Sequence, residues 1–130
     1  MGQPAAKKGD QVTATDIHIV LIPTAAGPIP TPLPHPFAGI LDNKLSDNVK
    51  IEGQAAATVD SIANNKPPHI PQGGPFQKPP SDKGKIISGS ATVNINGKAA
   101  ARNGDKAETC NDPADLPNGV VIATGTVLIG

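Results

Sequence analysis

The sequence contains an internal repeat in three copies, and the last copy is completed by the opposite end of the chain. The N-terminal stretch GQPAAKKGD (2–10) returns as GKAAARNGD (97–105), and a related GQAAATVD occupies 53–60. A Gly-led, β-branched segment precedes each internal copy, and a third such segment, GVVIATGTVLIG (119–130), stops where the others continue. The N-terminus supplies the missing continuation. This pattern predicts a closed, pseudo-threefold body with adjacent termini, because a linear array would not need its ends to complete each other.

The repeats are predicted at about 39–60, 84–105 and 119–130 plus 2–10, within one domain spanning 1–130. The motifs VKI, VNI and VLI predict short strands. Ser88-Gly89 and Thr124-Gly125 predict tight turns between paired strands. No helix start signal is followed by a 3.6-residue apolar period. The expected fold class is all-β, a short pseudo-threefold cone, and the alternative is chance similarity among Ala- and Gly-rich segments.

The composition predicts a weak hydrophobic core. The chain has 14 glycines, 15 prolines, two phenylalanines and neither Trp nor Tyr. A core of Ala, Val and Ile buries little area per residue, so we expect help from a metal, a partner or both. One cysteine excludes an internal disulfide.

The charge pattern excludes some partners. Eleven basic and eleven acidic residues balance, so nucleic acid and anionic membrane surfaces are not expected partners. No run approaches the roughly 20 apolar residues of a membrane helix. The N-terminus lacks the apolar stretch of a secretory signal, so synthesis in the cytoplasm is expected.

The candidate metal ligands all lie in the three linkers between the repeats, at 11–38, 61–83 and 106–118. The three histidines and the one cysteine of the chain are His18, His35, His69 and Cys110. In a closed threefold body the linkers emerge on the same side, so these side chains are expected to converge near the axis. Three imidazoles and one thiolate form a complete tetrahedral set for one structural Zn²⁺.

The spacing of these residues leaves other interpretations open. Neither C-x-x-C nor H-E-x-x-H occurs, and a single His or Cys is often an exposed or a core residue. Two linkers are rich in proline, at IPTAAGPIPTPLPHPF (22–37) and KPPHIPQGGPFQKPP (66–80). These prolines hold the ligands rigid at a zinc-bound apex, or they form a flexible loop that binds a partner.

The repeated motif resembles that of a known family. PAAK at Pro4–Lys7 and AAAR at Ala99–Arg102 are similar to the Pro-Ala-Ala-Arg motif of PAAR-repeat proteins, the spike tips of contractile injection machines. These machines include type VI secretion, extracellular injection systems and phage-like baseplates. The third copy, AAAT at Ala55–Thr58, lacks the basic residue. The resemblance covers 2–130.

The resemblance implies a fold, a metal and a partner. It implies a cone of three β-units whose apical zinc is held by His18, His35, His69 and Cys110. The cone would cap a trimeric spike of the VgrG or phage-spike kind, one tip per trimer, and help it pierce the target membrane when the sheath contracts. Effector cargo is a further expected partner, and the tip would travel with the particle out of the cell or into the target cell. The residues expected to dock on the spike are Val49, Ile51, Val93, Ile95, Val127 and Ile129.

Two other function classes remain open at this point. The first is a zinc-stabilised or Pro-rich β module that binds partners or acts as an effector adaptor. The second is a small zinc hydrolase. A catalytic zinc keeps three protein ligands and an open position for water, whereas Cys110 would fill the fourth position. We therefore do not expect an enzyme.

Overall fold

The fold is all-β, as the sequence predicts. The computed structural model describes residues 2–130, and in that range it contains no helix. The strands, in chain order, are β1 (Gln3–Pro4), β2 (Gln11–Ile22), β3 (Ile29–Asn43), β4 (Lys50–Ile51), β5 (Gln54–Ala55), β6 (Ile62–Asn65), β7 (Lys83–Ile86), β8 (Asn94–Ile95), β9 (Lys98–Ala99), β10 (Lys106–Thr109), β11 (Leu116–Ile122) and β12 (Leu128–Ile129).

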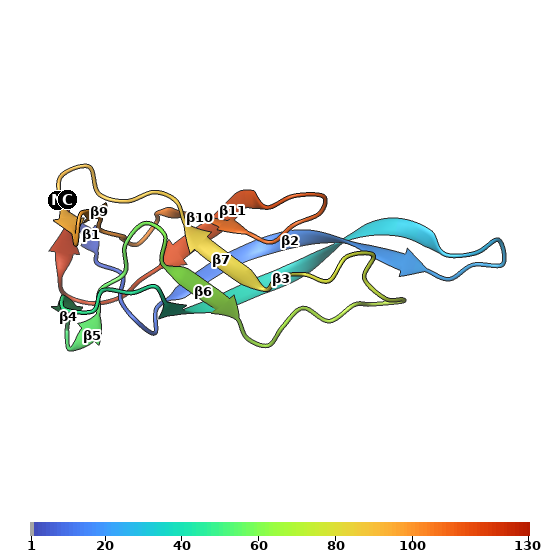
Figure 1. The fold of residues 1–130 in the computed structure, drawn as a ribbon, viewed down its shortest axis with the longest axis horizontal. Coiled ribbons are helices and arrows are strands. Elements are labelled where there is room, and N and C mark those ends of the chain that lie inside the picture. Colours follow the sequence, from blue (N-terminus) through green and yellow to red (C-terminus); the bar gives the residue numbers. More distant parts are fainter. Residues whose placement is uncertain (1) are drawn as a thin grey trace.

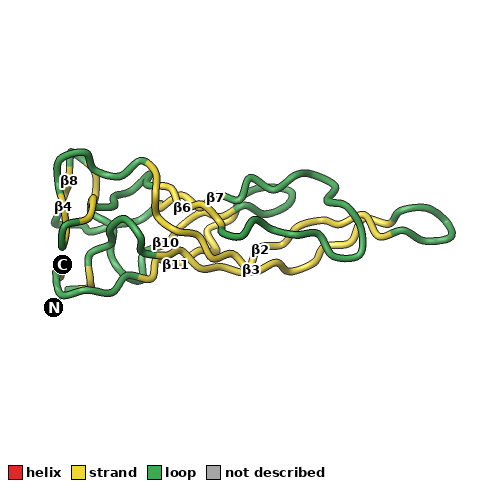
Figure 2. Tube along the Cα trace, turned by 90° about the horizontal axis from the view of Figure 1, so that it is seen from below, coloured by secondary structure: helices red, strands yellow, loops and turns green. Residues whose placement is uncertain are grey.

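The molecule tapers along one axis. Six strands close into an antiparallel barrel in the order β10-β11-β2-β3-β6-β7. The other six form three two-stranded sheets, β1–β12, β4–β5 and β8–β9, at the wide end (Figure 1). At the other end β2 and β3 continue past the barrel as a long hairpin (Figure 2). The result is a cone with a broad base and a narrow tip.

The wide end is organised around a ring of alanines. The amide N–H of Ala6 donates to Ala101 O, that of Ala101 donates to Ala57 O, and that of Ala57 donates to Ala6 O, at 2.9–3.1 Å. All three side chains are fully buried. A larger residue would separate the three backbones, because only a methyl group fits between them at this spacing.

The three small sheets pack over this ring in equivalent positions. Two of them are hairpins whose two-residue turns, Glu52-Gly53 and Asn96-Gly97, have positive φ at both positions. Such turns match the twist of paired strands and favour Gly at the second position. The third sheet has the two ends of the chain where the others have a turn, with Gln3 paired to Ile129. The predicted adjacency of the termini is therefore confirmed (Figure 1).

Phe37 fills the barrel, and glycines make room for it. Its ring is 2 % exposed. A Cβ on Gly39 would lie 2.6 Å from the ring, and one on Gly84 would lie 3.2 Å from it. Gly119 permits a similarly close approach, with Ala107 O at 2.9 Å. The glycine at the start of each strand segment is thus required by the narrow interior.

The linker at 11–38 differs from the predicted Pro-rich loop. It forms most of the β2–β3 hairpin, with Leu21 opposite Pro30 and Thr15 opposite Pro36. The prolines occur at every second position of β3, so their missing N–H groups never face β2. Strand geometry is therefore compatible with a segment whose composition is typical of a loop.

The prediction of tight turns at Ser88-Gly89 and Thr124-Gly125 is wrong. β7 pairs with β6 and β10, whereas β8 pairs with β9. β11 likewise pairs in the barrel and β12 pairs with β1. These dipeptides connect the barrel to the base, and each strand finds its partner elsewhere in the chain.

Candidate metal centre

The hairpin places an acid and two histidines on one face. Residues i and i+2 of a strand share a face, and so do directly opposed residues of an antiparallel pair. Asp16 and His18 are two positions apart on β2, and Asp16 lies opposite His35 on β3. All three are at most 3 % exposed. The inner face of the hairpin therefore changes from apolar at the Ala14–Phe37 pair to polar at the Asp16–His35 pair, two pairs further on.

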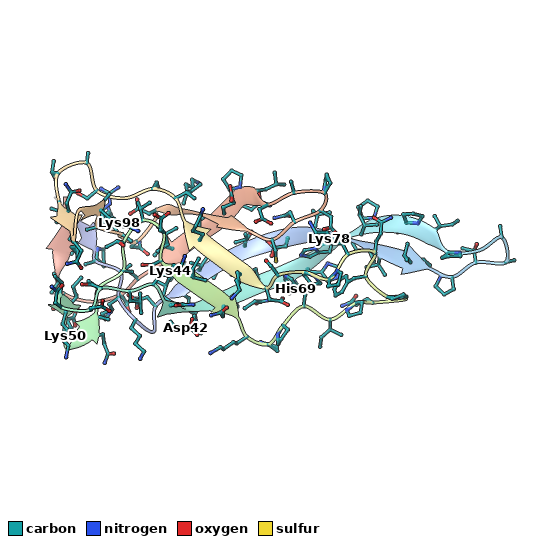
Figure 3. The ribbon with its side chains drawn as sticks, in the orientation of Figure 1. Asp42, Lys44, Lys50, His69, Lys78 and Lys98 are labelled. Atoms are coloured by element: carbon teal, nitrogen blue, oxygen red, sulfur yellow. The ribbon has the colours of Figure 1, made fainter. Side chains whose placement is uncertain are left out.

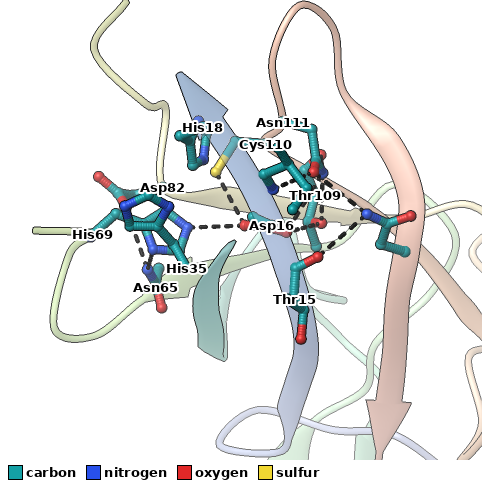
Figure 4. Close-up of polar contacts among 12 residues, drawn as sticks. Thr15, Asp16, His18, His35, Asn65, His69, Asp82, Thr109, Cys110 and Asn111 are labelled. Carbon is teal, nitrogen blue, oxygen red and sulfur yellow. Dashed lines mark hydrogen bonds and ion pairs between the residues drawn. The ribbon is translucent and has the colours of Figure 1, made fainter. Parts of the chain in front are cut away.

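Two other segments bring in His69 and Cys110. His69 lies between β6 and β7, and its backbone N–H donates to Asp82 Oδ1 at 2.8 Å. Its ring Nε2 lies 2.9 Å from Asp16 Oδ2, and its Nδ1 lies 3.3 Å from Asn65 Nδ2. Cys110 directly follows β10 and is 2 % exposed. Figure 4 shows how these side chains converge.

Three of the four predicted ligands lie in one cluster with Asp16, and the fourth, His35, lies beside it. The ring centroid of His18 is 4.9 Å from that of His69 and 5.6 Å from that of His35. One ligand atom from each of Asp16, His18, His69 and Cys110 lies within 4.8 Å of the others. The rings of His35 and His69 are 5.6 Å apart. The assignment of these four residues as metal ligands remains a prediction, and Asp16 is a residue that the sequence reasoning missed.

Two of the three histidines present a ring nitrogen that is free to bind a metal, whereas at His69 both ring nitrogens already contact Asp16 and Asn65. Both ring nitrogens of His18 are buried and have no hydrogen-bond partner among residues 2–130, which is costly unless another ligand occupies them. Burial lowers the pKa of His18, and the nearby carboxylate of Asp112 only partly opposes this. Nδ1–H of His35 donates to Leu33 O at 2.9 Å, so its Nε2 carries the lone pair. Neutral imidazoles with free lone pairs are metal ligands.

Cys110 needs a cation to become a thiolate. Burial, followed by the charge of Asp16, raises the pKa of this thiol to about 12. Metal binding deprotonates such a thiol, because the ion stabilises the sulfur anion directly. The donor set of imidazoles, thiol and carboxylate therefore fits a dication such as zinc.

The two phenylalanines of the chain enclose the cluster. The ring of Phe76 lies 5.3 Å from His35 and 5.7 Å from His18, between centroids. The ring of Phe37 lies 6.1 Å from His69 on the barrel side. An apolar shell of this kind limits access of water to the site. The centre lies partway along the long axis, and the hairpin continues beyond it (Figure 3).

The predicted docking residues lie at the base, and three of them point inward. Ile51, Ile95 and Ile129 are each 7 % exposed and form one buried cluster with three alanines, and Val49 and Val93 pack against it. These alanines are Ala5, Ala56 and Ala100. Val127 is 40 % exposed. The isoleucine side chains are therefore largely buried within the base. A partner at the base would contact neighbouring exposed groups instead, such as Leu128, which is 60 % exposed.

The basic residue of the repeated motif forms a structural bridge. Arg102 donates to both oxygens of Asp105 and to Gly89 O at 3.2 Å. Lys7 donates in the same way to Asp10 and to Thr124 O. In the copy that lacks a basic residue, Ser61 takes the place of the acid: its Oγ accepts from Thr58 N–H and donates to Lys44 O.

Comparison with known families adds one match. Residues 77–130 match the family described as PAAR motif, which confirms the resemblance to PAAR-repeat proteins. The matched segment includes Cys110, the β8–β9 hairpin and β12, and it contains none of the three histidines. No curated protein matches the chain. A PAAR motif supports a spike-tip role in a contractile injection or type VI secretion system.

Among residues 2–130 no helix is long and apolar enough to cross a membrane.

Proposed function

We propose that this chain is the tip of the spike of a contractile injection machine. The observation that carries the proposal is the PAAR motif at 77–130 on a tapered, closed β body. On this proposal the chain is a single PAAR-like domain, 1–130, with repeats at about 39–60, 84–105 and 119–130 plus 2–10. It is made in the cytoplasm, assembles on the particle and is delivered with it.

The metal has a structural role in this proposal. His18, His35, His69 and Cys110 hold one Zn²⁺, which ties the hairpin, the 66–82 segment and the end of β10 together. Structural zinc contributes about 10 kcal/mol or more in small sites, a large share for a chain with a small apolar core. With four protein ligands no position is open for a substrate water, so the centre is not proposed to catalyse hydrolysis.

The mechanical action follows from the shape. Force from sheath contraction passes along the cone axis and is concentrated at the narrow hairpin end, where the target membrane is met. Segments that are cross-linked by a metal cannot splay under this load. Effector cargo, where present, binds the exposed surface of the tip.

The base is proposed to dock on a trimeric spike. Three equivalent hairpins on one chain can each meet one subunit of a true trimer, so one tip covers three chains and their exposed strand edges. The proposed contact residues remain Val49, Ile51, Val93, Ile95, Val127 and Ile129, with the backbone and rims of the hairpins as the accessible part.

The test is the stoichiometry of the complex. The full chain is mixed with the trimeric spike protein of its own source, and the complex is weighed by native mass spectrometry. We expect one chain per trimer. Leu128→Asp at the base should weaken the complex by a factor of about ten or more, whereas Ile29→Asp, 50 % exposed at the hairpin end, should not. Absence of a complex, or equal loss in both variants, would overturn the proposed role.

A further inference from the structure

Asp16 is a buried acid that the predicted ligand set does not use. Its exposure is 0 %, and its one ion-pair partner within residues 2–130 is His69. Oδ2 lies 2.9 Å from His69 Nε2 and 3.4 Å from Cys110 Sγ. A buried carboxylate is costly unless it is paired with positive charge. Because Asp16 contacts two predicted ligands, the positive charge that it faces is that of the proposed metal ion.

The carboxylate is held in place by groups on its other side. Oδ1 accepts a hydrogen bond from the fully buried hydroxyl of Thr109 and a longer one, 3.5 Å, from Asn111 Nδ2. Asn111 Nδ2 also donates to Thr109 O at 3.1 Å. Asp16 is therefore fixed from β10 and the residues that follow it, the same segment that carries Cys110 (Figure 4).

The charges of the proposed centre require such a group. A dication bound to neutral imidazoles and one thiolate leaves a net charge of one positive unit inside the protein. Carboxylates near the predicted ligands include that of Asp16 and that of Asp112, whose Oδ2 is 3.5 Å from His18 Nδ1. Of these, Asp16 is the one that contacts two of the ligands, and in a low-dielectric interior its attraction for the ion is much stronger than in water. A monovalent ion bound to the same ligands is already neutral, so the carboxylate would give it no such advantage.

We propose that Asp16 is the counter-charge of the metal centre, a positioning residue that makes the site selective for a divalent ion over a monovalent one. This inference rests on the proposed metal centre. It adds to the four predicted ligands a fifth residue, which acts through its charge on the ion and through its contacts to His69 and Cys110.

The experiment compares two ions in full-length protein at one fixed pH. Affinities for Zn²⁺, and for Cu⁺ under anaerobic reducing conditions, are measured by competition with chromophoric chelators. Both ions suit thiolate and imidazole ligands. Asp16→Asn keeps the size and removes the charge. It should weaken Zn²⁺ binding about 10- to 100-fold, the range for residues that support metal ligands, and lower the Zn²⁺/Cu⁺ affinity ratio by about tenfold or more.

The control is Asp105→Asn, which removes another largely buried carboxylate at the base, with its side chain 7 % exposed. It should leave the ratio unchanged. An equal loss for both ions in Asp16→Asn would mean that the residue only supports the structure, and no loss would mean that it has no role; either result overturns the inference. If Asp16→Asn does not fold, the second variant is Asp16→Glu, which keeps the charge. This variant should keep the wild-type Zn²⁺/Cu⁺ affinity ratio, and a lower ratio in Asp16→Glu overturns the inference. A wild-type chain that binds neither ion contradicts the metal centre itself.

Discussion

At the residue scale, the barrel depends on one large side chain and the small ones around it. Phe37 occupies the narrow interior, and glycines stand where any Cβ would enter its ring. Alanines take the same role at the base, where three backbones meet. The sequence has few large apolar residues because the space inside the cone does not admit them.

We predict that Gly39→Ala destabilises the fold by about 1–3 kcal/mol, the usual cost of overpacking a tight core. The new methyl group would lie 2.6 Å from the Phe37 ring and 2.9 Å from Ala63 Cβ. Chemical denaturation measures the loss. Phe37→Leu should also lower the free energy of unfolding. The double variant Phe37→Leu, Gly39→Ala should lose less stability than the sum of the losses in the two single variants. Gly130→Ala serves as the control, because its methyl group would come no nearer than 3.7 Å to Thr92 Oγ1. Simple additivity of the two free-energy changes would contradict the packing explanation.

The repeat without a basic residue suggests a second prediction. Arg102→Thr leaves Asp105, whose side chain is 7 % exposed, without its cation, and an unsatisfied buried group costs about 1–3 kcal/mol. The double variant Arg102→Thr, Asp105→Ser copies the Thr58–Ser61 pair. We expect it to be more stable than Arg102→Thr alone. A double-variant protein that unfolds at lower denaturant than the single variant would contradict the equivalence of the two pairs.

At the element scale, the outward edges of the long hairpin offer few free backbone N–H donors for another strand. On β2 the outward N–H groups of Ile17 and Ile19 donate to the side chains of Asn111 and Asp112, and that of Leu21 donates to Pro75 O. On β3 the outward positions are prolines, which have no donor. Blocking both edges is a known protection against edge-to-edge association.

Replacing Pro32 and Pro34 by Thr should therefore make the chain self-associate. The substitution places two N–H donors on the open edge of β3, while the folded monomer should lose only about 1 kcal/mol or less. Sedimentation velocity over a range of concentrations measures the association. Pro71→Thr, in the exposed segment after β6, is the matched control. A variant that remains monomeric would show that the prolines serve another purpose.

The same hairpin marks the limit of sequence reasoning at this scale. The short strands at VKI, VNI and VLI were predictable because β-branched residues precede a clear repeat. β3 was not, because proline at alternate positions is typical of a loop unless the partner strand is known. Asp16 was missed for the same reason: only the strand pairing places it opposite His35 and beside His18.

At the scale of the whole molecule, the chain is closed by its two ends and tapers toward one hairpin. The order of the repeats in the sequence already implied that β1 and β12 would meet. The repeat also implied that the linkers gather on one side, and the histidines and the cysteine do lie close together, partway between the base and the tip. What the repeat could not give is the length of the hairpin beyond them, since that depends on pairing within a single linker.

The most direct test of the account is the metal content of the full chain. Protein purified without added metal or chelator is analysed by elemental and native mass spectrometry. We predict one zinc per chain in the wild type, and a loss of zinc together with a lower melting temperature in Cys110→Ser. A folded wild-type chain that contains no zinc, and takes up none when zinc is supplied in excess, would contradict the metal centre and leave the base and barrel to stabilise the cone alone.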